Sequence, residues 1–229
     1  MSSVNLAELS TKLDSPNSRD RLLALVALKD ATAEEALPLI KKVLKDESIQ
    51  VRGMAVFALG VKRQDENYEL LLQVLENDSD YSVRAAAAGA LGYLEDNRAL
   101  EPLLRIFYEE TDWLVRFSAA VSLGNLKDSR AKQALIEALD GDEVVLHQAA
   151  IAALGEIGDI EALDHILRFA DSKDWLVRQR LAEALGNLPS PKSLSALQYL
   201  AKDEHPQVSS AAQLSLQRQR DLSNADAAE

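Results

Sequence analysis

The string VRGMAVFALG at residues 51–60 returns twice along the chain, as VRAAAAGALG at 83–92 and as VRFSAAVSLG at 115–124. Weaker copies end at Gly155 and Gly186. The arginine of the string belongs to a column with a period of 31 or 32 residues, and a second, aliphatic column keeps the same period. Two columns in phase over six or seven copies predict a protein built from stacked repeats. The arginine column holds Arg21, Arg52, Arg84, Arg116, His147, Arg178 and Ser209, and the aliphatic column holds Leu39, Leu71, Leu103, Leu135, Ile166 and Leu197.

Each repeat contains two helical patterns. The second helix is predicted to begin at a capping residue four positions before the arginine column, and to end at the glycine of the string, acting as its C′ residue. The capping residues are Ser48, Asp80, Asp112 and Asp174. We therefore expect an all-α, right-handed α-solenoid of about seven two-helix repeats without strands. Residues 1–217 are expected to form this single solenoid, and residues 218–229 a polar, frayed tail.

The composition excludes several classes of function and partner. The chain has 229 residues, no cysteine and a formal net charge of −12. Disulfides, cysteine-ligated metals and thiol catalysis are thereby excluded, and nucleic acid is an unfavourable partner. We see no signal peptide at the N-terminus and no apolar run long enough to span a bilayer, so the expected location is the cytoplasm.

Helical periodicity separates a core face from a free face on each second helix. Positions −1, +3 and +7 from the arginine column are apolar in nearly every repeat, so positions +1, +5 and +9 lie on the opposite side. Repeats two to four carry small and apolar residues there, whereas repeats five and six carry mainly polar ones. Either neighbouring helices cover these residues or they form an exposed binding surface. The residues in repeats two to four are Gly53, Phe57, Val61, Ala85, Gly89, Tyr93, Phe117, Val121 and Asn125.

A second row, which we call the edge row, occupies position −3. Both tryptophans lie in it, each within the string DWLVR at 112–116 and 174–178. These side chains either pack between repeats or anchor a partner. The arginine column is expected to form a ladder of bonds to acidic residues or carbonyls, and His147 is either a packed histidine or a weak candidate proton donor. The edge row comprises Ile49, Tyr81, Trp113, Val144, Trp175 and Pro206.

Catalytic and cofactor motifs are absent. The sequence contains no HExxH string, no phosphate-binding glycine loop and no metal-ligand spacing, and its three histidines fall in separate repeats. We therefore predict no metal site, and the sequence leaves open whether the protein is an enzyme.

The 31-residue period and its core pattern resemble the short HEAT-like repeats of the phycobilin lyase family of cyanobacteria. The strings at 51–60, 112–117 and 179–187 are most similar to the members that act in phycobilisome degradation, and the resemblance spans nearly the whole chain. In HEAT-type stacks the second helix lines the concave side, so positions +1, +5 and +9 are expected to face a groove.

The resemblance implies phycobiliproteins as partners, such as phycocyanin and allophycocyanin subunits, and help in detaching their thioether-linked bilins. It implies no permanent cofactor but a transient bilin such as phycocyanobilin, and a cytoplasmic location beside the thylakoid. A non-catalytic adaptor and a bilin attachment lyase or chaperone are the alternatives. The candidate partner- or bilin-binding residues are Phe57, Arg84, Tyr93, Trp113, Arg116, Phe117, Val121 and Trp175.

Overall fold

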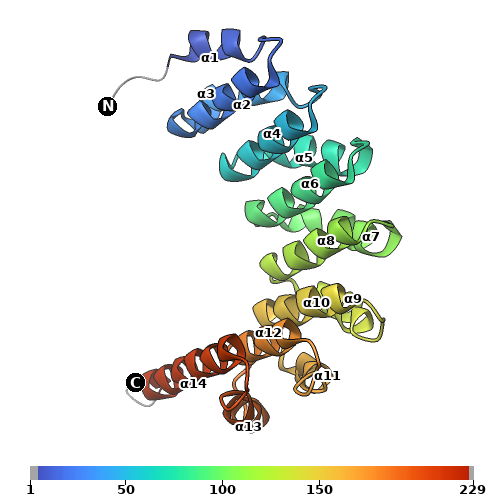
Figure 1. Cartoon of the computed structure of the whole chain (residues 1–229), viewed down its shortest axis with the longest axis vertical. Coiled ribbons are helices and arrows are strands. Elements are labelled where there is room, and N and C mark those ends of the chain that lie inside the picture. Colours follow the sequence, from blue (N-terminus) through green and yellow to red (C-terminus); the bar gives the residue numbers. More distant parts are fainter. Residues whose placement is uncertain (1–4, 227–229) are drawn as a thin grey trace. The chain divides into compact units, whose positions relative to one another are not determined.

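The structure, a computed structural model, describes residues 5–226, with side chains as far as residue 221. Over this range the chain is an α-solenoid in which each first helix precedes its second helix along the sequence, and no residue is in a strand (Figure 1). The predicted all-α fold is confirmed. The first helices are α1 (Leu6–Lys12), α3 (Ala33–Lys42), α5 (Asp65–Asn77), α7 (Leu100–Glu109), α9 (Lys132–Ala138), α11 (Leu163–Leu167) and α13 (Pro191–Leu200). The second helices are α2 (Ser18–Ala27), α4 (Ile49–Val61), α6 (Tyr81–Leu94), α8 (Trp113–Asn125), α10 (Val144–Ile157), α12 (Trp175–Leu185) and α14 (Pro206–Asp226).

Short 3-10 segments extend four of the connections. They are η1 (Leu28–Asp30), η2 (Asn97–Ala99), η3 (Ser129–Ala131) and η4 (Ile160–Ala162). The chain divides into two compact units, an N-terminal unit of Met1–Ala119 and a C-terminal unit of Ala120–Glu229. In the N-terminal unit α2 packs on α4 and α4 on α6, and in the C-terminal unit α10 packs on α12 and α12 on α14.

The core consists of the positions that periodicity assigns to it. Val51, Ala55 and Leu59 of α4 are fully buried, as are their counterparts on α6, α10 and α12. The aliphatic column is fully buried from Leu71 onward, but in the second repeat Ile40 is the buried residue and Leu39 is half-buried. The expected column is therefore displaced by one residue there, because α3 presents Ile40 to the core.

Gly186 follows the last residue of α12, but the other glycines of the repeated string do not end the second helices, so the predicted C′ role is wrong for those. Gly60, Gly124 and Gly155 lie inside α4, α8 and α10. A Cβ on Gly155 would stand 2.6 Å from the Cα of Ala184 in α12, and one on Gly124 would stand 2.6 Å from the Cα of Ala153 in α10. These glycines are required because the backbones of successive second helices approach closely.

Most of the predicted N-caps are confirmed. The carboxylates of Asp80, Asp112 and Asp174 accept backbone N–H groups from the first turns of α6, α8 and α12. Ser48 is the exception, because its hydroxyl donates to Gln50 Oε1 instead. Three of the four capping residues therefore act as the sequence predicts.

Second helices end in more than one way. Glu95 and Gly158 adopt positive φ directly after α6 and α10, and Lys127 does so two residues after the end of α8. After α4, the buried side chain of Asn67 donates instead to the carbonyl oxygens of Leu59 (2.8 Å) and Lys62 (2.7 Å). A side-chain amide thus satisfies helix-end carbonyls where the backbone makes no left-handed turn.

The last helix extends further than the sequence suggests. α14 continues to Asp226, and within the expected tail Gln219 is buried and donates to the carbonyl oxygen of Leu185 (2.7 Å). Residues 218–221 therefore belong to the helix because they pack back on the end of α12. Residues 227–229 of the expected tail lie outside the described part of the chain.

Candidate functional site

The arginine column forms the ladder that the sequence predicts. Each of four arginines pairs with a carboxylate 25 or 26 residues further on: Arg21–Asp46 (2.7 Å), Arg52–Asp78 (2.8 Å), Arg84–Glu110 (2.9 Å) and Arg178–Asp203 (2.6 Å). Each of these guanidinium groups also donates to the carbonyl oxygen six residues before it. The ladder thereby ties each of these second helices to its own loop and to the loop of the next repeat.

The arginines of the ladder also lower the pKa of carboxylates that they pair with. Arg178 donates to Asp203 and holds the pKa of that carboxyl below its ordinary value, although partial burial acts in the opposite direction. Burial would raise the pKa of Glu110, but hydrogen bonds from Arg84 and from nearby backbone N–H groups outweigh it and hold that pKa below the ordinary value. Both carboxylates are charged in the folded protein because a cation and N–H donors surround them.

Two predicted binding residues, Arg84 and Arg116, are engaged by the chain itself. Arg84 belongs to the ladder through Glu110. The Arg116 Nε donates to the carbonyl oxygen of Phe107 (3.3 Å), and its guanidinium carbon lies 5.9 Å from the centroid of the Phe107 ring. Neither side chain is directed toward the face that carries Phe57 and Tyr93.

His147 takes the place of an arginine in the ladder. Its Nε2 lies 2.7 Å from the carbonyl oxygen of Gly141, which is again six residues upstream. Its ring is tilted against that of Phe169, with the ring centroids 4.9 Å apart. These contacts match the packed, hydrogen-bonded interpretation of His147.

The second helices of the N-terminal unit carry an exposed apolar surface, which we call the open face. Phe57, Val61 and Tyr93 are each 58% exposed, and Phe117 is half-buried. Ala85, at position +1 of α6, is buried, because α6 turns this part of its surface toward its neighbours. In the C-terminal unit, Val121 is 37% exposed. We define the open face as Val26, Gly53, Phe57, Val61, Gly89, Tyr93 and Phe117.

Two glycines of the open face differ from those that contact the next helix. A Cβ on Gly53 or Gly89 would meet no atom within 4 Å, and neither residue has a positive φ. An interior helical glycine costs about 1 kcal/mol relative to alanine. Neither packing nor backbone conformation therefore accounts for these two glycines.

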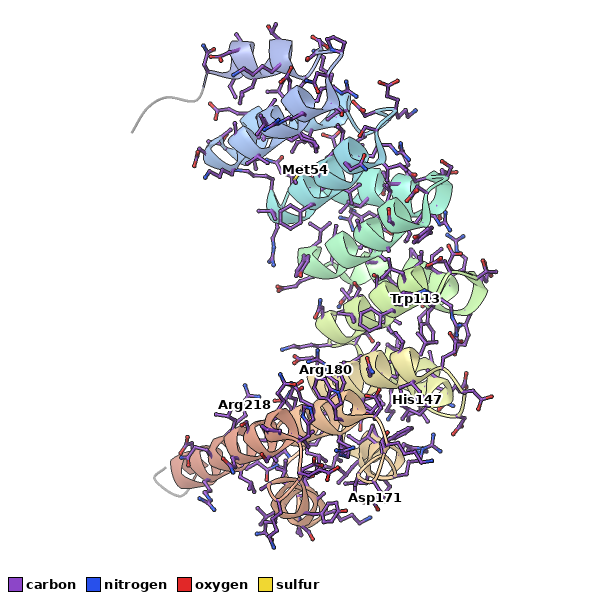
Figure 2. All side chains as sticks on the ribbon, in the orientation of Figure 1. Met54, Trp113, His147, Asp171, Arg180 and Arg218 are labelled. Carbon is purple, nitrogen blue, oxygen red and sulfur yellow. The ribbon has the colours of Figure 1, made fainter. Side chains whose placement is uncertain are left out.

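The two tryptophans of the edge row have different surroundings despite their identical local strings. Trp175 stacks on His205, with ring centroids 4.2 Å apart and planes 11° from parallel. Trp113, labelled in Figure 2, begins α8 and is 53% exposed. No aromatic ring in the described part of the chain stacks on it. Tyr81, at the start of α6, is similarly exposed.

The corresponding face of the C-terminal unit is mainly polar, although Leu214, at position +5 from Ser209, is 73% exposed. Gln179 and Arg180 both donate to the carboxylate of Glu183, and Arg218 donates to Asn187 Oδ1. A cleft of about 580 Å³ lies between α12 and α14 here, lined by polar side chains such as Gln207 and Ser210 and by the apolar Leu214. The polarity change that the sequence predicts between repeats four and five is therefore present in the surfaces of the two units.

The open face extends one repeat further toward the N-terminus than the sequence pattern indicates. Leu23 and Val26 of α2 are both exposed, and Val26 stands at position +5 from Arg21, as Phe57 does from Arg52. The first repeat is degenerate in sequence and resembles a capping repeat, which obscures its free face. The spacing from the arginine column is nevertheless the signal that identifies Val26.

Neither a metal-binding cluster nor a membrane-spanning helix is found among the described residues. Within residues 5–226, no group of histidine and acidic side chains could hold a metal ion. None of the described helices is long and apolar enough to cross a bilayer.

Solved structures similar to this chain include a phycocyanin lyase chain above 25% identity. The chain is 28% identical to a chain in the complex of CpcE and CpcF of phycocyanin lyase from Nostoc sp. PCC7120, with a TM-score of 0.65 over 80% of this chain and 75% of that one. The Escherichia coli protein YibA is 20% identical, with a TM-score of 0.59 over 93% and 92% of the two chains, and therefore supports the fold alone. No curated protein sequence matches the chain.

A family model describes most of the repeats directly. The model for HEAT repeats matches residues 68–150 and 139–217, which together span more than half of the chain. The repeat period, the buried columns and the arginine ladder agree with that match. The chain therefore belongs to the HEAT-repeat family.

Proposed function

We propose that this protein binds phycobiliproteins through its open face and assists phycobilisome degradation by helping to detach bilin chromophores, as a protein of the NblB type. The partner class comes from the likeness to phycocyanin lyase. The observation that carries the docking surface is the pair of open glycines, Gly53 and Gly89, among the exposed side chains of Phe57 and Tyr93. The protein is expected to act in the cytoplasm, at the thylakoid surface where phycobilisomes lie.

The glycines support close docking because they expose the helix backbone. Gly89 lies one turn before Tyr93 on α6, and Gly53 lies one turn before Phe57 on α4. A small residue beside a large aromatic one makes a recess with a wall, into which a partner side chain or a flat chromophore fits. Exposed aromatic residues contribute most where a partner removes them from water.

A cation for the propionates of a bilin would come from the end of this face. Arg63, two residues after Val61, is 55% exposed and pairs with Glu95 (3.0 Å), two residues after Tyr93. An exposed pair of this kind contributes little to stability, so a propionate can compete with Glu95 for Arg63. Arg84 and Arg116 are less suited to this role than the sequence suggests because other groups already hold them.

An adaptor function is the second candidate. The imidazole of His147 is held by Gly141 and packs against Phe169, which favours a structural role over proton transfer. In this alternative the open face recruits the phycobiliprotein and another protein does the chemistry. Mixing the protein with holo-phycocyanin and following the bilin absorbance separates the two, because only the detaching factor releases or alters the chromophore.

Binding itself is tested with two matched tyrosines. Tyr93 on the open face and Tyr108 on α7 are 58% and 57% exposed. Burying an aromatic side chain contributes about 1.5–3 kcal/mol, so Tyr93→Glu should weaken phycocyanin binding by at least about tenfold. Tyr108→Glu should leave binding unchanged. Equal effects of the two variants, or no effect of Tyr93→Glu in a protein that stays folded, would exclude the open face as the docking surface.

A further inference from the structure

Carboxylates that do not belong to the ladder lie at the start of α6, at the start of α8 and at the end of α7, and two of them directly precede exposed aromatic residues. The ladder uses Asp46, Asp78 and Glu110 to pair Arg21, Arg52 and Arg84. The carboxylates of Asp80, Asp112 and Glu109 are not part of these ion pairs. Asp80 directly precedes Tyr81, and Asp112 directly precedes Trp113.

These aspartates cap their helices and keep room for a further donor. Asp80 Oδ1 accepts from the backbone N–H of Ser82 (2.9 Å) and from the hydroxyl of the same residue, and Asp112 Oδ1 accepts from the N–H of Leu114 (2.9 Å). Each carboxylate has two oxygens, so these bonds leave acceptor capacity for a donor from outside. Glu109, at the end of α7, is exposed.

The C-terminal unit contains the other tryptophan of the edge row, Trp175, and shows which side chain packs against it. Trp175 lies in the same local string and is 38% exposed, and the imidazole of His205 stacks on its ring at 4.2 Å and nearly parallel. The backbone N–H of His205 is bound by Asp203. A flat nitrogen-containing side chain thus stacks on Trp175, whereas no aromatic ring in the described part of the chain stacks on Trp113, which is 53% exposed.

We propose that Tyr81 and Trp113, with Asp80, Asp112 and Glu109, form a site for an arginine-rich basic segment of a partner protein. A guanidinium group stacks on indole and phenol rings and donates to carboxylates in one plane, which makes it the side chain that suits both features. The negative field of the chain, −12 overall, draws such a segment toward the site. This site is separate from the open face and does not depend on the identity of the phycobiliprotein partner.

Tryptophan fluorescence tests the proposal on the full chain. The sequence contains two tryptophans, so Trp175→Phe leaves Trp113 as the only one. Titration with a short peptide of alternating arginine and glycine should change Trp113 fluorescence saturably, and added salt should weaken the binding. In the reciprocal Trp113→Phe protein, Trp175 is the only tryptophan, and it stacks on His205. Its fluorescence should show no saturable change when the peptide is added. A response of Trp175 alone, or a response of Trp113 to a glutamate–glycine peptide instead, would overturn the proposal.

Charge-matched variants separate the site from the general field of an acidic protein. Asn caps helices as well as Asp does, so Asp80→Asn/Asp112→Asn removes two charges and keeps both N-caps. In the Trp175→Phe background we expect this pair to weaken peptide binding about three- to tenfold. Glu34→Gln/Glu69→Gln removes two exposed charges elsewhere in the same unit and should have little effect. Equal losses in the two pairs would mean non-specific attraction only. The Tyr93→Glu protein should bind the peptide normally, so failure here and failure of the open face are distinguishable.

Discussion

Glycine-to-alanine substitutions at two interior positions of second helices should change stability in opposite directions. Gly89 lies inside α6 with no atom within 4 Å of the place that an alanine methyl group would take, whereas the same methyl group at Gly155 in α10 would lie 2.6 Å from both the Cα and the Cβ of Ala184. Gly89→Ala removes a residue that costs about 1 kcal/mol in a helix interior. The free energy of unfolding should therefore rise by about 1 kcal/mol, with an increase of about 2–4 °C in Tm.

Gly155→Ala should have the reverse effect. An ordinary contact begins at 3.4 Å, so α10 and α12 would have to separate by about 1 Å, and the blocking Cα of Ala184 cannot rotate away. Overpacking of this kind costs about 1–3 kcal/mol and exceeds the gain in helix propensity. Urea and thermal unfolding of the two variants measure both effects. A destabilised Gly89→Ala protein would refute the reasoning, because it would mean that the open face is already covered within the molecule.

Three further predictions concern the ends and the ladder of the repeats. Asn67→Ala should lower the free energy of unfolding by about 1–3 kcal/mol, since it leaves one buried and one partly buried carbonyl oxygen without their donor, and urea unfolding would detect the loss. Asp112→Ala should cost about 1 kcal/mol through loss of the N-cap of α8, whereas Asp112→Asn should cost much less; equal melting temperatures for the two proteins would argue against the cap. Because the folded-state pKa of Asp203 is lowered, its ion pair with Arg178 stabilises the protein above the ordinary aspartate pKa of about 4, and this stabilisation is lost as the pH falls through the lower folded value. The Asp203→Asn protein should be less stable than the unsubstituted protein at neutral pH. In acid titrations followed by circular dichroism, its stability should fall less steeply as the pH is lowered.

Local periodicity explains why so much of the fold could be predicted. Val51, Ala55 and Leu59 recur at one helical face, and the structure buries that face in each unit. The same periodicity places Phe57 and Tyr93 on the opposite side, where both are exposed. Whether a helix face is apolar depends on residues within one helix, so the sequence contains that information.

Contacts between repeats could not be predicted in the same way. Gly60 looks like a helix terminator because glycine often ends helices, yet its role depends on Ala90, thirty residues away, whose Cβ lies 3.0 Å from where a glycine Cβ would stand. Arg84 looks like a cation beside an aromatic groove, but Glu110 of the next repeat pairs with it. The arginine column predicts a ladder, but its spacing does not identify the carboxylate that each arginine takes.

The sequence alone determined the repeat, its two helices and the apolar character of the free face in repeats two to four, because each follows from spacing within a helix. Only the tertiary structure decided which side chains on that face and in the edge row remain free to contact a partner. Trp113 is 53% exposed with no aromatic ring stacked on it, whereas Trp175 is 38% exposed and stacks on His205. The two tryptophans share the string DWLVR, and they differ because the residue that the neighbouring repeat brings against them is set by packing and not by their own sequence.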